Sequence, residues 1–172
     1  GGSLQADIIA MTRVNNFNGT NSQNNINLLQ TEINDAIQSG GSLDLLTYSN
    51  VKGSIQGTNN SQNKIQAIGS TIPNDITQNT GSMELYLTNS NAGTQTNNKI
   101  GITNATFGLY ANSSTVKNIE LSNSTGTGIS SDLTLTGTFT QTNGRSTMTF
   151  ADSKFQSQNS IKLTDTTSAS LI

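Results

Sequence analysis

A four-residue pattern recurs from residue 87 onward: an apolar residue, a small residue, Asn or Asp, and a second small residue. Asn and Asp tolerate the left-handed backbone conformation that a sharp corner needs, and their side chains can bond the local backbone. The pattern therefore predicts a strand that ends in a corner, used repeatedly. Its Asn or Asp stands at Asn89, Asn104, Asn123, Asp152 and Asp165.

Short runs with an apolar residue at every second position precede these corners and also occur earlier in the chain. A period of two indicates a strand with one buried face. The corners are spaced irregularly, by 13 to 29 residues. This spacing favours coils with loops of different lengths over a strict array. We expect strands at residues 43–48, 54–56, 64–68, 83–87, 99–102, 118–121, 132–135, 147–150 and 160–163.

One earlier segment, residues 26–38, has a helical periodicity. Its apolar side chains fall near one helical face, and the glycines at positions 40 and 41 supply a stop of the kind that helices use. We therefore predict one amphipathic helix over residues 26–38. Residues 4–14 fit a helical stripe or a strand equally well. The side chains that define the predicted helical face are Ile26, Leu29, Ile33 and Ile37.

The length of 172 residues suits one domain. We expect residues 1–25 to form an N-terminal arm and residues 26–172 to form a single β-rich domain. The first three residues, Gly-Gly-Ser, have the look of a processed or engineered end, so we take the chain as mature or truncated.

The composition is polar without being charged. Charged residues make up 10% and hydrophobic residues 31%, whereas typical soluble domains have about 25% and about 45 to 50%. Disordered chains combine low hydrophobicity with high net charge, but this chain has a net charge of −2 and a single proline, Pro73. Uncharged polar side chains suit turns and stacked ladders, so the composition favours repetitive β-structure.

The sequence contains no histidine and no cysteine. This removes the commonest general base, the thiolate nucleophile and the usual metal ligands. The acidic residues are scattered singly, so we predict no catalytic residues, no metal site and no cofactor. No basic stripe offers a footprint for nucleic acid, and no apolar run approaches the roughly 20 residues that span a bilayer.

The strand-and-corner units behind an amphipathic helix resemble the right-handed parallel β-helix of the pectin-lyase-like superfamily. The resemblance implies that residues 26–38 cap the first coil and that Asn-bearing corners stack in successive coils as far as residue 163. The expected fold is an all-β parallel β-helix, or solenoid, with one N-terminal capping helix; a β-sandwich is the alternative. The histidine-bearing catalytic motif of the family has no counterpart here, so the resemblance implies a non-catalytic member.

Both ends of the chain are apolar, and an exposed strand edge is a template for pairing with another chain. We therefore expect a homo-oligomer or polymer: an extracellular structural or adhesive protein in a surface filament, fibre or spike, on a cell surface or a virion. The residues predicted to mediate self-association are Ile8, Ile9, Met11, Leu171 and Ile172.

Two alternative functions remain open. The first is a glycan-binding module or receptor-binding fibre domain, in which Tyr86 and Tyr110 contact surface glycans. The second is an enzyme that cleaves polysaccharide through two acids, since glycoside hydrolysis needs only a pair of carboxyl groups a few ångströms apart.

Overall fold

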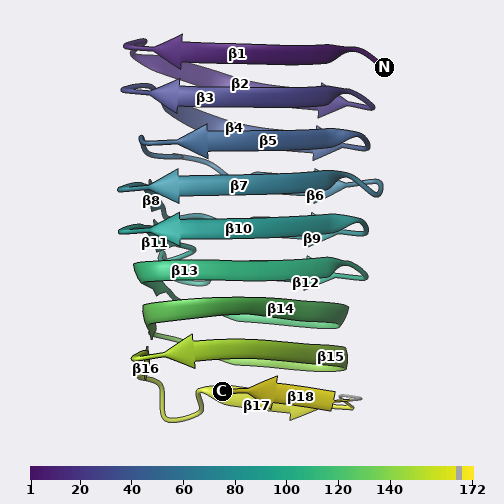
Figure 1. The fold of residues 1–172 in the computed structure, drawn as a ribbon, viewed down its shortest axis with the longest axis vertical. Coiled ribbons are helices and arrows are strands. Elements are labelled where there is room, and N and C mark those ends of the chain that lie inside the picture. The colour runs from purple at the N-terminus through teal and green to yellow at the C-terminus, as the bar shows by residue number, and fades with distance from the viewer. Residues whose placement is uncertain (166–167) are drawn as a thin grey trace.

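The computed structural model describes residues 1–165 and 168–172, and these wind into a parallel β-solenoid of about eight turns (Figure 1). The all-β solenoid predicted from the sequence is confirmed. The strands are β1 (Ser3–Ile9), β2 (Arg13–Thr20), β3 (Gln23–Leu29), β4 (Glu32–Ser39), β5 (Ser42–Thr47), β6 (Ile55–Thr58), β7 (Gln62–Ile68), β8 (Thr71–Ile72), β9 (Ile76–Asn79), β10 (Ser82–Thr88), β11 (Asn91–Ala92), β12 (Ile100–Thr103), β13 (Thr106–Val116), β14 (Ile119–Leu135), β15 (Phe139–Ala151), β16 (Lys154–Phe155), β17 (Ile161–Thr164) and β18 (Ser168–Leu171).

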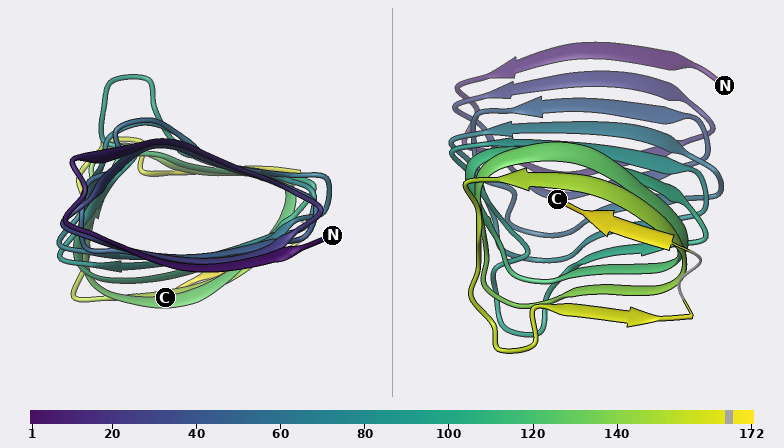
Figure 2. Two further views of the ribbon diagram at one scale, coloured as in Figure 1. Left: turned by 90° about the horizontal axis from the view of Figure 1, so that it is seen from above. Right: turned by 60° about the horizontal axis from the view of Figure 1, so that its bottom comes forward.

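The coil has three faces, and the strands pair in parallel along each of them. The first face stacks β1, β3, β5, β7 and β10, continues through parts of β13, β14 and β15, and ends at β18. The second face stacks β2, β4, β6, β9 and β12, continues through β14 and β15, and ends at β17. The third face is short and contains β8, β11 and β16. Seen from above, the coils superimpose into one closed outline (Figure 2).

The coil length is close to constant. On the first face, Ala6, Ile26, Leu45, Ile65 and Leu85 occupy one inward ladder, at intervals of 19 or 20 residues. The next member of that ladder, Leu109, follows after 24 residues. The extra residues form the loop between β11 and β12, which projects from the outline of the coils (Figure 2).

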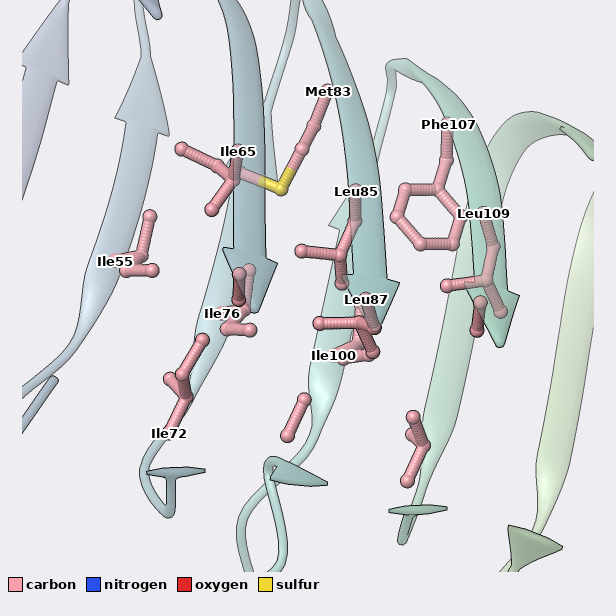
Figure 3. Close-up of a cluster of buried hydrophobic side chains, with 14 of the residues drawn as sticks. Ile55, Ile65, Ile72, Ile76, Met83, Leu85, Leu87, Ile100, Phe107 and Leu109 are labelled. Atoms are coloured by element: carbon pink, nitrogen blue, oxygen red, sulfur yellow. The ribbon is translucent and has the colours of Figure 1, made fainter. Parts of the chain in front are cut away.

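The core is a set of apolar ladders inside the coil. Figure 3 shows Ile55, Ile76 and Ile100 stacked from successive strands of the second face, facing Ile65 and Leu85 from the first. All five are at most 1% exposed. Each fully buried side chain of this size contributes about 1.5–3 kcal/mol relative to an exposed one, so stacking coils is what stabilises the fold.

The corner prediction is confirmed at all five positions. Asn89, Asn104, Asn123, Asp152 and Asp165 have φ angles between 48° and 52°, in the left-handed region. The residue that follows Asp165 in the pattern lies outside the described residues. Corner backbones also bond from coil to coil: the N–H of Asn104 donates to the carbonyl of Ser122 at 3.0 Å.

The predicted helix at residues 26–38 is wrong, because this segment forms the end of β3 and most of β4. Its helical spacing arose from two strands joined by a corner at Gln30, where φ is 50°. Of the four residues of the predicted helical face, Ile26 and Ile33 are buried, but Leu29 is 36% exposed. Leu28 and Ala36, which lie off that face, are buried instead. In residues 4–14 the strand alternative holds, since β1 and the start of β2 lie there and pair with β3 and β4.

Buried amides fill one corner of the coil and account for part of the unusual composition. Gln78 is 1% exposed, and its Nε2 donates to the carbonyls of Ser61 at 3.0 Å and Thr80 at 2.7 Å. Its Oε1 accepts from Nδ2 of Asn63 at 2.9 Å. Gly57 pairs with Gln78, and a Cβ there would lie 2.0 Å from Oε1, so the amide needs a glycine beside it. The same arrangement occurs two coils earlier with Gln38, Asn24 and Gly19.

Candidate functional site

The N-terminal end of the solenoid leaves one strand edge unpaired. Among the described strands, β1 pairs only with β3, and β2 only with β4. The inward ladder positions of this first coil are apolar but incompletely covered: Leu4 is 47% exposed, and Ile8, Val14 and Phe17 are half-buried against the core. This end therefore presents both backbone groups and apolar side chains.

The C-terminal end is similar. Within the described residues, β17 and β18 each pair only with β15. Ile161 and Leu163 occupy inward ladder positions yet are 46% and 48% exposed. A hollow of about 240 Å³ opens here, with Phe155, Ile161 and Leu171 in its lining. The two ends lie at opposite extremes of the long axis (Figure 1).

The residues predicted for self-association divide between these two ends. Ile8 faces the core from β1, whereas Ile9 and Met11 point outward and are 60% and 56% exposed. At the other end Leu171 packs against the core and Ile172 is 74% exposed.

Five further residues belong to the end surfaces and were missed by the sequence reasoning. Each looks like an ordinary core residue in its own strand, and only the pairing register shows that no coil covers it. They are Leu4, Phe17, Phe155, Ile161 and Leu163.

The structure brings Tyr86 and Tyr110 together on the outer side of the first face. They are register partners of β10 and β13, and their rings stack with centroids 4.8 Å apart and an interplanar angle of 14°. Nζ of Lys64 lies 5.4 Å from the centroid of the Tyr86 ring. The hydroxyl of Tyr86 donates to Oε2 of Glu84 at 3.0 Å. Partial burial, followed by this hydrogen bond, raises the pKa of Tyr86 above its ordinary value.

Beside the tyrosines, two hollows join into a shallow axial trough. One, of about 240 Å³, is lined by Asp44, Lys64 and Glu84 among others. The second, of about 190 Å³, also includes Glu84 and continues past Gly108 to Tyr110. Gly108 is the register partner of Glu84, and because glycine has no side chain, the trough extends across β13 at this position. The lining therefore combines hydroxyl and amide groups with apolar carbon atoms, and it holds one cation between two carboxylates.

Nothing in the described part of the chain gathers three or more acidic side chains in a way that could hold a metal ion. Among residues 1–165 and 168–172, none belongs to a helix with the length and apolarity to cross a membrane.

Comparisons of the chain with protein-family models, with curated proteins and with solved structures each found no match. The class of protein is accordingly defined by the structure alone, as a parallel β-solenoid.

Proposed function

We propose that this chain is a non-catalytic structural or adhesive subunit that associates end to end with copies of itself, in an extracellular filament, fibre or spike. The observation that carries the proposal is the pair of unpaired strand edges, β1 at one end and β18 with β17 at the other. Exposed edges recruit strands from other chains, because each offers a row of backbone donors and acceptors. Within this proposal the protein is a non-catalytic relative of the pectin-lyase-like β-helices.

Parallel addition of β1 of a second copy to β18 would continue the first face. In the register of that face, Leu4 of the new copy lies next to Ala169, and Ala6 next to Leu171. A large side chain thus meets a small one at both positions. The first and last described strands both belong to the first face, so this face has one rung more than the second face. The contact therefore rests on strand pairing along the first face rather than on a full coil. Such a junction is expected to be reversible.

Two single-end variants test this contact. Leu4→Lys should block the N-terminal edge and Ala169→Lys the C-terminal edge, because a charge on an inward ladder position opposes edge pairing. Sedimentation velocity over a range of concentrations should show large species for the wild type and arrested growth for each variant. Thr147→Lys, on an exposed outward position in β15, is the matched control and should assemble normally.

A mixture of the two end variants sharpens the test. Head-to-tail association predicts that the mixture gains one junction and no more, since only one intact edge of each kind is present. A wild-type chain that remains monomeric at every concentration would contradict the proposal. Variants that still elongate separately would also contradict it.

The axial trough favours a second candidate, a glycan-binding role. Tyr110, which stacks on Tyr86, lines the same part of the trough as Thr125 and Thr127. Aromatic faces beside hydroxyl and carboxylate groups can hold sugar rings. Because Asp44 and Glu84 outnumber Lys64, the trough should favour neutral glycans over polyuronates.

A glycan array with the wild type and Tyr110→Ala tests this candidate. Binding to neutral glycans should fall in the variant, while Tyr48→Ala, which changes an exposed tyrosine outside the trough, should leave it unchanged. Binding that survives Tyr110→Ala, or that is confined to acidic glycans, would contradict the role.

A further inference from the structure

We propose that a straight apolar stripe along one edge of the first face, formed by Ile9, Leu29, Tyr48 and Ile68, binds a second copy of this chain side by side. The inference rests on the proposed function only in requiring that the chain associates with itself. It adds a lateral contact that the strand edges at the two ends do not provide.

The stripe is one outward ladder on four successive coils. Ile9 pairs with Leu29 in the β1–β3 register. The N–H of Tyr48 donates to the carbonyl of Leu28 at 3.2 Å, which places Tyr48 beside Leu29, and the pair Thr47–Ala67 places Ile68 beside Tyr48. Strands in a sheet lie about 4.7–4.9 Å apart, so the four side chains form a row about 14 Å long.

The stripe is exposed where an ordinary solenoid surface is polar. Ile9 is 60% exposed, Tyr48 is 48% exposed and Leu29 is 36% exposed, and Met11 beside Ile9 is 56% exposed. On the later coils the same ladder carries only small or polar side chains. These are Thr88, Asn112, Ser131 and Ala151.

The exposed area is sufficient for a weak dimer. With Met11 included, these fractions amount to roughly 400 Å² per copy, if a large side chain has about 200 Å² of surface. Two copies would bury roughly 800 Å², less than the about 1,200–2,000 Å² of stable specific interfaces. The lateral contact is therefore expected to be reversible, with a dissociation constant in the micromolar range or weaker.

A second copy is the occupant that matches the shape and charge of the stripe. A straight row is complemented by another such row, and a two-fold axis brings the same row of a copy against it. When that axis runs parallel to the solenoid, each residue of the stripe meets its own counterpart. Asp7 in β1 and Arg13 at the start of β2 are both exposed and lie on either side of Ile9 along the chain. With this axis Asp7 of each copy faces Arg13 of the other at the same rung, which gives two attractive pairs per dimer.

A substitution within the stripe tests the contact. Leu29→Asp should weaken lateral dimerisation at least about tenfold, because it places a charge at the centre of the apolar row. Thr147→Asp, on an exposed position of β15 away from the ladder of the stripe, is the matched control, with no change expected. Sedimentation equilibrium measures both, and circular dichroism verifies that each variant is folded.

Single cysteines test the register, because the chain has no cysteine of its own. If the two-fold axis runs parallel to the solenoid, the two copies lie parallel. This parallel arrangement predicts that Ile9→Cys forms a disulfide-linked dimer with itself under oxidation, and that Ile68→Cys does the same. An antiparallel arrangement would instead cross-link Ile9→Cys only with Ile68→Cys, three rungs away. That result would overturn the parallel register.

Charge exchange gives an independent check on the same register. Asp7→Arg and Arg13→Asp should each weaken the dimer, and the double variant should restore it. Failure of the double variant to recover would count against the Asp7–Arg13 pairing.

The end variants separate this inference from the proposed function. Leu4→Lys and Ala169→Lys should leave the lateral dimer intact while stopping elongation. If the end variants lose all association while Leu29→Asp associates as the wild type does, the stripe is overturned and end-to-end assembly still stands. A strictly monomeric wild type would overturn both.

Discussion

Replacing Gln78 by Glu tests whether buried amides hold the corner of the coil together. In Gln78→Glu the shape of the side chain is nearly kept, but the Nε2 donor to the carbonyls of Ser61 and Thr80 is lost. A protonated acid can still donate to one carbonyl. Leaving the other unpaired in a site that is 1% exposed should cost about 1–3 kcal/mol at low pH.

At neutral pH the cost should be larger. Burial and the two facing carbonyl oxygens disfavour the carboxylate, while the donor Nδ2 of Asn63 offsets this only in part. Buried glutamates with pKa values of about 8–9 are known, against about 4.3 in an unfolded chain. The folded variant then retains a proton that the unfolded chain releases, so its stability is greatest below about pH 4.3 and decreases as pH rises. Between pH 4.3 and 7 the loss is about 3–4 kcal/mol, at 1.36 kcal/mol per pH unit.

Urea unfolding followed by circular dichroism at pH 4, 5.5 and 7 measures this loss. Gln56→Glu is the matched control, because Gln56 lies in β6, is exposed, and neighbours the rung of Gln78. Its stability should change by less than about 0.5 kcal/mol across the same range. Equal pH dependence in the two variants would refute the reasoning about the buried amide.

Three further predictions concern the core, a corner and the tyrosine pair. Phe139→Ala, at a fully buried position, should lower the free energy of unfolding by about 3–5 kcal/mol, whereas Ile129→Ala, at a position 67% exposed, should change it by less than about 0.5 kcal/mol, both measured by urea unfolding. Asn123 has a φ of 50°, so Asn123→Val should destabilise the fold by about 1–2 kcal/mol, and Asn123→Gly should destabilise it much less. The thermal midpoints of the two variants measure this difference, and equal losses would contradict the corner argument. Because the pKa of Tyr86 is raised in the fold, its contribution to stability should decline as pH rises above about 10, and Tyr86→Phe should remove the tyrosinate absorbance step that lies above the ordinary tyrosine range.

The strand-and-corner reading could be made from the sequence because it depends on local chemistry. Asn and Asp at positive φ and side chains that alternate between faces leave clear local signals, and all five corners follow them. Their irregular spacing has a simple origin. Asn89 and Asp152 belong to one corner of the coil and Asn104, Asn123 and Asp165 to another, so two regular series are interleaved.

Local patterns wrongly predicted a helix at residues 26–38, and they could not reveal the apolar stripe. Two strands joined at Gln30 imitate a helical period, because the corner shifts the alternation between Leu28 and Ala36. The stripe joins residues about 20 positions apart, so its members are neighbours only once the register between coils is known. Tyr86 and Tyr110 were singled out as aromatic residues, but their 24-residue separation hid the stacking.

The nearly constant coil length also determines how this chain can acquire its structure. Each coil contacts only the coils above and below, so stability accumulates by nearest-neighbour coupling, as in a one-dimensional chain of units. Folding is then expected to nucleate in the apolar middle and to propagate outward like a zipper, with the first and last coils fraying most readily. Docking of another molecule on an end coil would give it a second neighbour, so polymerisation would suppress fraying and slow amide hydrogen exchange there.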